Sequence, residues 1–157
     1  MKRIILKNLK YTEEFGKILS RVLGPGSLLC LNGDLGAGKT TLTQTIGKQL
    51  KVKEYVNSPS YSLMNSYKGV YKIYHYDLYK LNSVDDALDI GIEDYIYSDE
   101  DIVIIEWANK IKSILPKNRI DINISINNRE RIVEINGRGK FYIELLKELN
   151  KNDSFRN

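Results

Sequence analysis

The spacing of apolar residues predicts a β-α-β arrangement in the first third of the chain. Residues 3–9 have the length and composition of a short strand, and 27–32 form a continuous apolar run typical of a strand buried on both faces. Between them, apolar residues recur at helical intervals from a Thr12 cap to the run 24–26 (Gly-Pro-Gly), which predicts a helix. A glycine-rich loop follows the second strand, and a second helix is expected over 40–50.

Hairpins, short helices and one more buried strand are predicted in the rest of the chain. We expect paired strands at 61–67 with 70–78 and at 119–126 with 129–135, and a buried strand at 101–107. Helices are expected within 83–97 around Gly91, over 108–115 before Pro116, and over 141–149. This order predicts a single α/β domain over residues 1–150, with a mixed central sheet flanked by helices. Residues 151–157 are expected to form a frayed tail.

Composition and charge are those of an ordinary globular chain. Of the 157 residues, 42% are hydrophobic, and no apolar run approaches the roughly 20 residues of a membrane-spanning helix. A single cysteine, Cys30, excludes an internal disulfide, so we expect a buried thiol in a cytoplasmic protein. The net charge of +4 comes with no dense basic cluster, and charge alone does not argue for direct nucleic-acid binding.

Two local biases leave alternatives open. Residues 81–101 hold eight acidic side chains and no Lys or Arg, which indicates either solvated helix faces or an acidic patch that faces a partner. Seven of the 11 tyrosines lie between 55 and 79, where half-buried strand packing is favoured over a base-stacking platform. His75, the single histidine, lies in a predicted strand and is expected to pack there rather than to act in catalysis.

The strongest functional signal is the loop between the second strand and the second helix. Residues 33–40, Gly-Asp-Leu-Gly-Ala-Gly-Lys-Thr, match the motif G-x-x-x-x-G-K-[ST] at every fixed position. The glycines allow backbone N–H groups to face a phosphate, and the following helix presents its N-terminus to the same charge. Lys39 is expected to contact the β- and γ-phosphates, and Thr40 to ligate Mg²⁺. The motif therefore predicts a P-loop nucleotide-binding domain.

Two acidic residues stand at the ends of predicted strands. Glu106 directly follows the apolar run 102–105, and Asp77 closes the strand before it. Ligands of an open α/β sheet bind at the carboxyl ends of its strands, so both acids are expected near the phosphates if those strands run parallel to the loop's strand. An ordinary strand-end or surface position is the alternative for each. Lys112 stands where a guanine-reading N-K-x-D motif has Asp, which favours ATP over GTP.

Five stretches together make the chain resemble the TsaE (YjeE) family, small ATPases of bacterial tRNA threonylcarbamoyladenosine synthesis. They are the phosphate loop and the segments 56–63 (VNSPSYSL), 75–81 (HYDLYKL), 91–95 (GIEDY) and 103–108 (VIIEWA). The resemblance implies a P-loop α/β fold and slow ATP hydrolysis that becomes productive on the TsaB–TsaD heterodimer. That heterodimer attaches a threonylcarbamoyl group to N6 of adenosine 37 in tRNAs that read ANN codons. Family members do not transfer the group, and their hydrolysis is thought to reset the complex, so tRNA is expected as an indirect partner.

The resemblance also implies roles for individual residues. Lys39, Asp77 and Glu106 match catalytic positions, and Thr40 and Glu106 match the magnesium ligands. The expected nucleotide-binding residues are Thr12, Gly33, Asp34, Leu35, Gly36, Ala37, Gly38, Lys39, Thr40, Thr41, Ser60, Trp107 and Arg129. Two positions depart from the family pattern: Ser60 replaces a threonine, and Lys80 replaces an arginine and so loses a bidentate donor.

Two other functions stay open on the sequence alone. A small-molecule kinase would share the phosphate loop, but such enzymes usually carry an Arg-rich lid and the sequence has no such cluster. A non-hydrolysing module gated by nucleotide would bind ATP and change a partner's affinity without turnover. The leading hypothesis is a nucleoside triphosphate hydrolase that is weak alone and stimulated by its partners.

Overall fold

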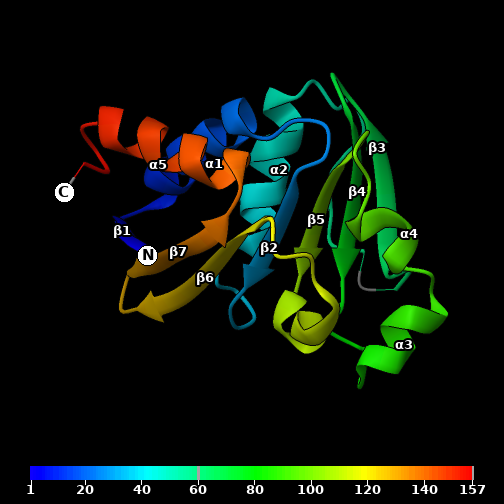
Figure 1. The fold of residues 1–157 in the computed structure, drawn as a ribbon. Helices are drawn as coiled ribbons and strands as arrows, with labels where there is room; N and C mark the ends of the chain where they lie inside the picture. The colour runs from blue at the N-terminus through cyan, green and yellow to red at the C-terminus, as the bar shows by residue number, and fades with distance from the viewer. Residues whose placement is uncertain (60, 157) are drawn as a thin grey trace.

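A seven-stranded mixed sheet forms the centre of the molecule, in the order β1-β7-β6-β2-β5-β4-β3 (Figure 1). The computed structural model describes residues 1–59 and 61–156. Strands β6, β2, β5 and β4 run parallel to one another, while β7, β1 and β3 each pair antiparallel with a neighbour. The strands are β1 (Lys2–Leu6), β2 (Leu28–Asn32), β3 (Met64–Lys68), β4 (Lys72–Asp77), β5 (Ile102–Glu106), β6 (Arg119–Asn127) and β7 (Glu130–Arg138). The predicted α/β fold with a mixed sheet is confirmed.

Helices cover both faces of this sheet (Figure 1). Helices α1 (Leu9–Val22), α2 (Lys39–Gln49) and α5 (Lys140–Lys151) pack on one face, and α3 (Val84–Asp89), α4 (Glu93–Ile96) and the 3₁₀ helix η1 (Ala108–Ile114) pack on the other. Strand β2 alternates between the two layers, because Leu29 and Leu31 join the α1–α2–α5 side while Leu28 and Cys30 join the other. The expected double burial of this strand is confirmed. Burial also raises the pKa of the Cys30 thiol, which makes it unreactive.

The first helix begins earlier than the sequence predicted. Asn8 is its N-cap, with the Asn8 Oδ1 accepting from the Tyr11 backbone N–H at 3.3 Å. The Thr12 hydroxyl instead donates to the Asn8 carbonyl at 3.4 Å, inside the first turns. The prediction of a Thr12 cap is wrong because asparagine is preferred over threonine at this position and the helix gains a turn by using it.

The chain end also differs from its prediction. Phe155 is 2% exposed and packs edge-on against the rings of Tyr11 and Phe15, each at a centroid distance of 6.1 Å. Asn152 Nδ2 donates to Glu14 Oε1 at 2.9 Å, so this segment is held on α1. The described part of the tail is therefore packed rather than frayed, because one late aromatic residue finds an apolar site. Strand β1 and helix α5 lie at the same side of the molecule (Figure 1).

The short helices of the acidic segment form where they were expected. Ser83 and Asp86 make a capping box at the start of α3, and Gly91 has a φ of +72° at the turn into α4. The tyrosine-rich region divides between packing and exposure, since Tyr67 and Tyr76 are buried while Tyr55 and Tyr61 are exposed. Among the described residues, no helix is long and apolar enough to span a membrane.

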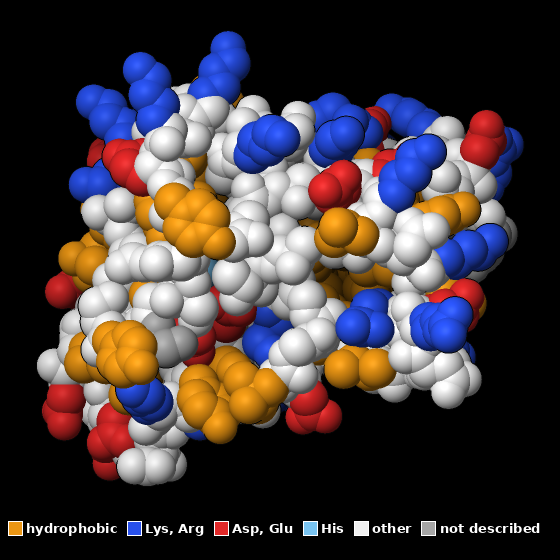
Figure 2. Space-filling model, turned by 180° about the vertical axis from the view of Figure 1, so that it is seen from behind, with side chains coloured by type: hydrophobic (Ala, Val, Ile, Leu, Met, Phe, Trp, Pro, Cys, Tyr) orange, Lys and Arg blue, Asp and Glu red, His pale blue; other side chains and the backbone are white. Residues whose placement is uncertain are grey.

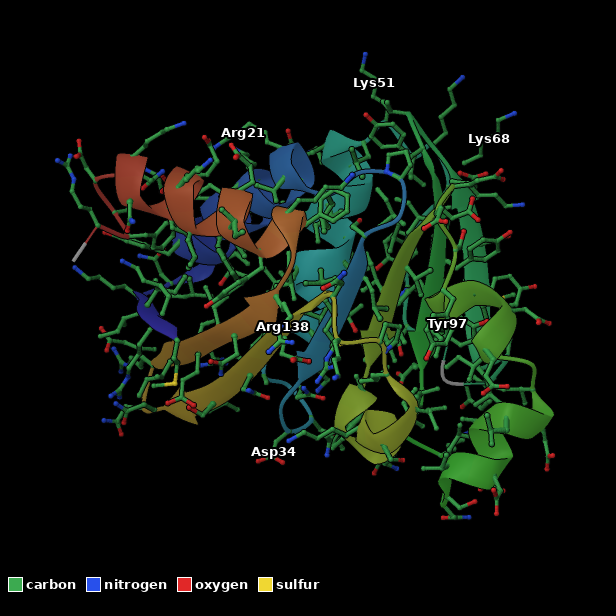
Figure 3. All side chains as sticks on the ribbon, in the orientation of Figure 1. Arg21, Asp34, Lys51, Lys68, Tyr97 and Arg138 are labelled. Carbon is green, nitrogen blue, oxygen red and sulfur yellow. The ribbon has the colours of Figure 1, made fainter. Side chains whose placement is uncertain are left out.

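The parallel strands bring their carboxyl ends to one edge of the sheet. Strands β2, β5 and β4 end there at Asn32, Glu106 and Asp77, and Asp77 stands beside Glu106 in register. Figure 3 shows Asp34 at this edge and Lys51 and Lys68 at the opposite one. The phosphate-loop motif and both predicted acids therefore share one edge.

Candidate nucleotide site

The glycine-rich loop joins β2 to α2 and leaves open space above its backbone. Gly36 and Gly38 have φ angles of +77° and +111°, and a Cβ on either would meet nothing within 4 Å. Gly33 is different, because its Cβ would lie 2.5 Å from the Ile124 carbonyl oxygen. Gly38 is the N-cap of α2 and has no side chain to cap the first backbone N–H groups. The loop is thus an open cradle with the positive end of a helix dipole at its floor, which suits a phosphate.

Lys39 lies across this loop. Its Nζ donates to the carbonyl oxygens of Gly33 and of Asp34, the latter at 3.0 Å, and lies 4.5 Å from the centroid of the Trp107 ring. Burial lowers the pKa of the Lys39 ammonium, while the carboxylates of Glu106, Asp77 and Asp34 oppose that shift. The Lys39 ammonium can give up its hydrogen bonds to the two backbone carbonyl oxygens and bind a phosphate instead. A bound phosphate would restore the preference of the lysine for its charged form.

Glu106 is the hub of a buried hydrogen-bond chain. The Thr40 hydroxyl donates to Glu106 Oε1 at 3.0 Å, and His75 Nε2 lies 2.8 Å from Glu106 Oε2. Glu106 is 2% exposed and His75 is completely buried. The structure therefore brings the two predicted magnesium ligands together and adds His75, which the sequence had indicated as a packing residue.

Asp77 lies beside Glu106 with its own set of donors. The backbone N–H of Tyr79 donates to Asp77 Oδ1 at 3.0 Å, and the Ser58 hydroxyl donates to Oδ2. The side chain is buried, at 5% exposed. Its contact with Ser58 ties the acid to the segment before Pro59, and the predicted switch residue Ser60 lies outside the described residues.

A cavity of about 190 Å³ opens beside the loop and collects the more distant predicted residues. Thr12 and Arg129 line it together with parts of the loop and of α2, namely Gly36, Ala37, Gly38 and Thr41. Arg131, which the sequence analysis did not single out, also lines it and donates to the Gly36 carbonyl at 3.4 Å. On the face seen in Figure 2, the surface has a hollow with hydrophobic side chains at its floor and Lys and Arg side chains along part of its rim. The cavity is suited to the part of a nucleotide that extends beyond the phosphates.

Trp107 closes the other side of the loop and has a strained backbone. Its φ of +59° is left-handed, and its ring lies 5.2 Å from that of Tyr79. Lys110 Nζ donates to the carbonyls of Tyr79 and Leu81, which fixes the strand-to-helix connection under these rings. The contacts of Lys110 could not be predicted from the sequence, because its local pattern is that of an ordinary surface position on a helix. Of the other predicted loop residues, Leu35 is 66% exposed and points away from the packed interior.

The donor set fits a magnesium ion that is shared with phosphate. Thr40 and Glu106 supply two oxygen ligands of the type Mg²⁺ prefers, and the ion usually completes its shell with water and phosphate oxygens. Among residues 1–59 and 61–156, no group of three or more His, Cys, Asp or Glu side chains forms a separate metal site. A larger cavity, about 680 Å³, lies at the amino end of β2 around Gly26 and Arg138, away from this chemistry.

The fold and this edge of the sheet define a class, the P-loop nucleotide-binding proteins. The family model "Threonylcarbamoyl adenosine biosynthesis protein TsaE" matches residues 6–133. The chain therefore belongs to the TsaE family.

Relatives and a solved structure agree with this assignment. The chain is 34% identical over 152 residues to the tRNA threonylcarbamoyladenosine biosynthesis protein TsaE of Bacillus subtilis, covering 96% of this chain and 94% of the relative. It is 38% identical to the protein of the same name from Haemophilus influenzae over 129 residues, 81% of each chain. The crystal structure of Bacillus subtilis YdiB matches with a TM-score of 0.79 and 29% identity, covering 95% of this chain and 93% of that one.

Proposed function

We propose that this chain is an ATP-hydrolysing subunit required for threonylcarbamoylation of N6 of adenosine 37 in tRNAs that read ANN codons. The observation that carries the proposal is the convergence of Lys39, Thr40 and Glu106 on one open phosphate loop, with Asp77 alongside. The names of the relatives, which are tRNA threonylcarbamoyladenosine biosynthesis proteins, support the pathway.

Each residue has a physical task in this proposal. The loop amides and Lys39 hold the β- and γ-phosphates, and Thr40 and Glu106 hold Mg²⁺. When bound, the ion neutralises charge that develops on the phosphate oxygens. Asp77, buried and fixed by the Tyr79 N–H and Ser58, orients the attacking water. Thr12, Arg129 and the cavity beside the loop hold the nucleoside part.

Partners complete the proposed activity. The chain acts with the TsaB–TsaD heterodimer in the cytoplasm and reaches tRNA through that complex, and hydrolysis resets the complex between rounds. Support comes from exposed tyrosines in the segments before and after Asp77: Tyr61 is 94% and Tyr79 is 43% exposed, and Lys80 Nζ lies 4.2 Å from the Tyr61 ring centroid. Aromatic side chains are enriched in the buried cores of protein–protein interfaces.

The test is a pull-down of this chain with TsaB–TsaD, with and without ATP, with phosphate release measured on the same samples. We expect weak hydrolysis alone, stimulation by TsaB–TsaD, and loss of hydrolysis in Glu106→Ala. Normal turnover by that variant with its partners would show that the roles are wrongly assigned. Transfer of labelled phosphate to a small molecule would indicate a kinase, and a change in partner affinity without turnover would indicate a gated binding module.

A further inference from the structure

His75 is a buried histidine in which one ring nitrogen has a hydrogen-bond partner and the other has none among the described residues. It lies on β4 opposite Ile104 of β5, on the face that carries Glu106 and Asp77. Its Nε2 is 2.8 Å from Glu106 Oε2. Among the described residues, no hydrogen-bond partner reaches its Nδ1, although that atom is buried. The hydrogen bond of this buried ring goes to a single carboxylate oxygen of Glu106, which points to a role for that hydrogen bond.

The chemistry of the pair fixes the direction of the hydrogen bond. A carboxylate oxygen accepts, so Nε2 carries the hydrogen and donates. A second hydrogen on Nδ1 would be a buried donor facing no acceptor among the described residues, which is unfavourable. The geometry therefore selects the tautomer that carries its hydrogen on Nε2.

The two oxygens of Glu106 have different partners as a result. Oε2 is taken by the His75 N–H, and Oε1 faces the Thr40 hydroxyl at 3.0 Å. Without His75, the carboxylate would be free to turn and offer either oxygen to Thr40 or to the ammonium of Lys39. The hydrogen bond from His75 thus fixes Oε2 of Glu106 and leaves Oε1 beside Thr40.

We propose that His75 is a positioning residue that sets the orientation of Glu106 for magnesium binding. The inference rests on the proposed function, because it concerns the same two magnesium ligands. Residues that orient a metal ligand through its second oxygen typically change metal affinity by about 10- to 100-fold when they are replaced. If His75 merely filled space in the sheet, replacing it would change stability and leave metal affinity unaltered.

A matched pair of substitutions separates the two ring nitrogens. The side-chain amide nitrogen of glutamine reaches the position of Nε2, whereas that of asparagine reaches only the position of Nδ1. We therefore expect His75→Gln to keep the orientation of Glu106 and His75→Asn to lose it. The measurement is Mn²⁺ affinity of the ADP complex by electron paramagnetic resonance, on untagged full-length chain, together with ADP affinity in EDTA and thermal unfolding.

The expected result is a Mn²⁺ affinity about 10- to 100-fold weaker in His75→Asn and close to wild type in His75→Gln, with metal-free ADP affinity unchanged in both. Equal Mn²⁺ affinity in His75→Asn and wild type would overturn the inference while leaving the proposed function intact. If wild-type chain with ADP binds no Mn²⁺, the magnesium site of the proposed function is wrong, and the inference fails with it.

A measurement on the unaltered chain covers the case in which a variant does not fold. Because the sequence holds one histidine, the two ring nitrogens of ¹⁵N-labelled protein give one unambiguous pair of signals. We expect the hydrogen on Nε2 in the free protein, and a shift of that signal when Mg²⁺ joins the ADP complex. A hydrogen on Nδ1, or an Nε2 signal that does not respond to Mg²⁺, would contradict the proposal.

Discussion

Replacing either of two glycines of the phosphate loop by alanine should have a different effect: one substitution should lower stability, and the other should lower nucleotide affinity. At Gly33, a Cβ would lie 2.5 Å from the Ile124 carbonyl oxygen and 3.1 Å from the Ala37 Cβ, against the neighbouring strand β6. Gly33 also has a φ of +149°, so the variant suffers backbone strain of about 1–3 kcal/mol and overpacking of about 1–3 kcal/mol. We expect Gly33→Ala to lose about 2–6 kcal/mol of the free energy of unfolding.

Gly38→Ala should instead lose nucleotide affinity. Its φ of +111° brings similar strain, about 1–3 kcal/mol, but its Cβ would meet nothing within 4 Å. That open space is where the phosphates are proposed to lie, so the methyl group should weaken ADP binding by at least about tenfold, or about 1.4 kcal/mol. Gly91→Ala is the control, because Gly91 has a φ of +72° and lies away from the loop.

Urea denaturation and ADP titration of the three variants test this contrast. The fluorescence of Trp107, the single tryptophan, reports on binding because its ring lies beside Lys39. We expect Gly33→Ala to be the least stable, and Gly38→Ala to bind ADP more weakly than Gly91→Ala. Wild-type ADP affinity in Gly38→Ala would refute the placement of the phosphates. A Gly33→Ala variant as stable as Gly38→Ala would refute the steric argument.

Three further predictions concern single residues. Because burial lowers the pKa of Lys39 and bound phosphate should raise it, ADP affinity should fall as pH rises through that lowered pKa, with proton uptake on binding. Calorimetry in buffers of different ionisation enthalpy measures the proton uptake on ADP binding. An ADP affinity that does not change with pH would contradict this prediction. Asp77→Asn should lower partner-stimulated hydrolysis by about 100-fold and leave ADP affinity nearly unchanged, so wild-type turnover would remove Asp77 from catalysis. Phe155→Ala should destabilise the chain by about 3 kcal/mol in urea, whereas a frayed end would give no change.

The sequence predicted the framework of the site because its signals are local. The phosphate-loop motif identifies the loop between β2 and α2, and the uninterrupted apolar run before Glu106 identifies a strand buried on both faces. Parallel pairing of β4, β5 and β2 then brings Asp77 and Glu106 to the loop, as expected for ligands at strand carboxyl ends.

What the sequence did not predict depends on tertiary contacts. The contact of His75 with Glu106 follows from a register that places the two side chains within reach, and no local pattern signals that pairing. The Asn8 cap is an exception, because asparagine is intrinsically preferred over threonine at a helix N-cap and the sequence alone favours it. Phe155 is one apolar residue in a polar tail, so only the site formed by Tyr11 and Phe15 shows that it is buried.

The central claim is that ATP hydrolysis at this site supports tRNA threonylcarbamoylation, and the most direct measurement is product formed over several rounds. TsaB–TsaD, a threonylcarbamoyl donor and an ANN-reading tRNA are combined with ATP and either wild-type chain or Glu106→Ala. Mass spectrometry then counts N6-threonylcarbamoyladenosine at position 37 per heterodimer. We expect multiple rounds of synthesis with wild type and no more than about one with the variant. Equal multiple-round synthesis with Glu106→Ala, or with the chain omitted, would contradict it.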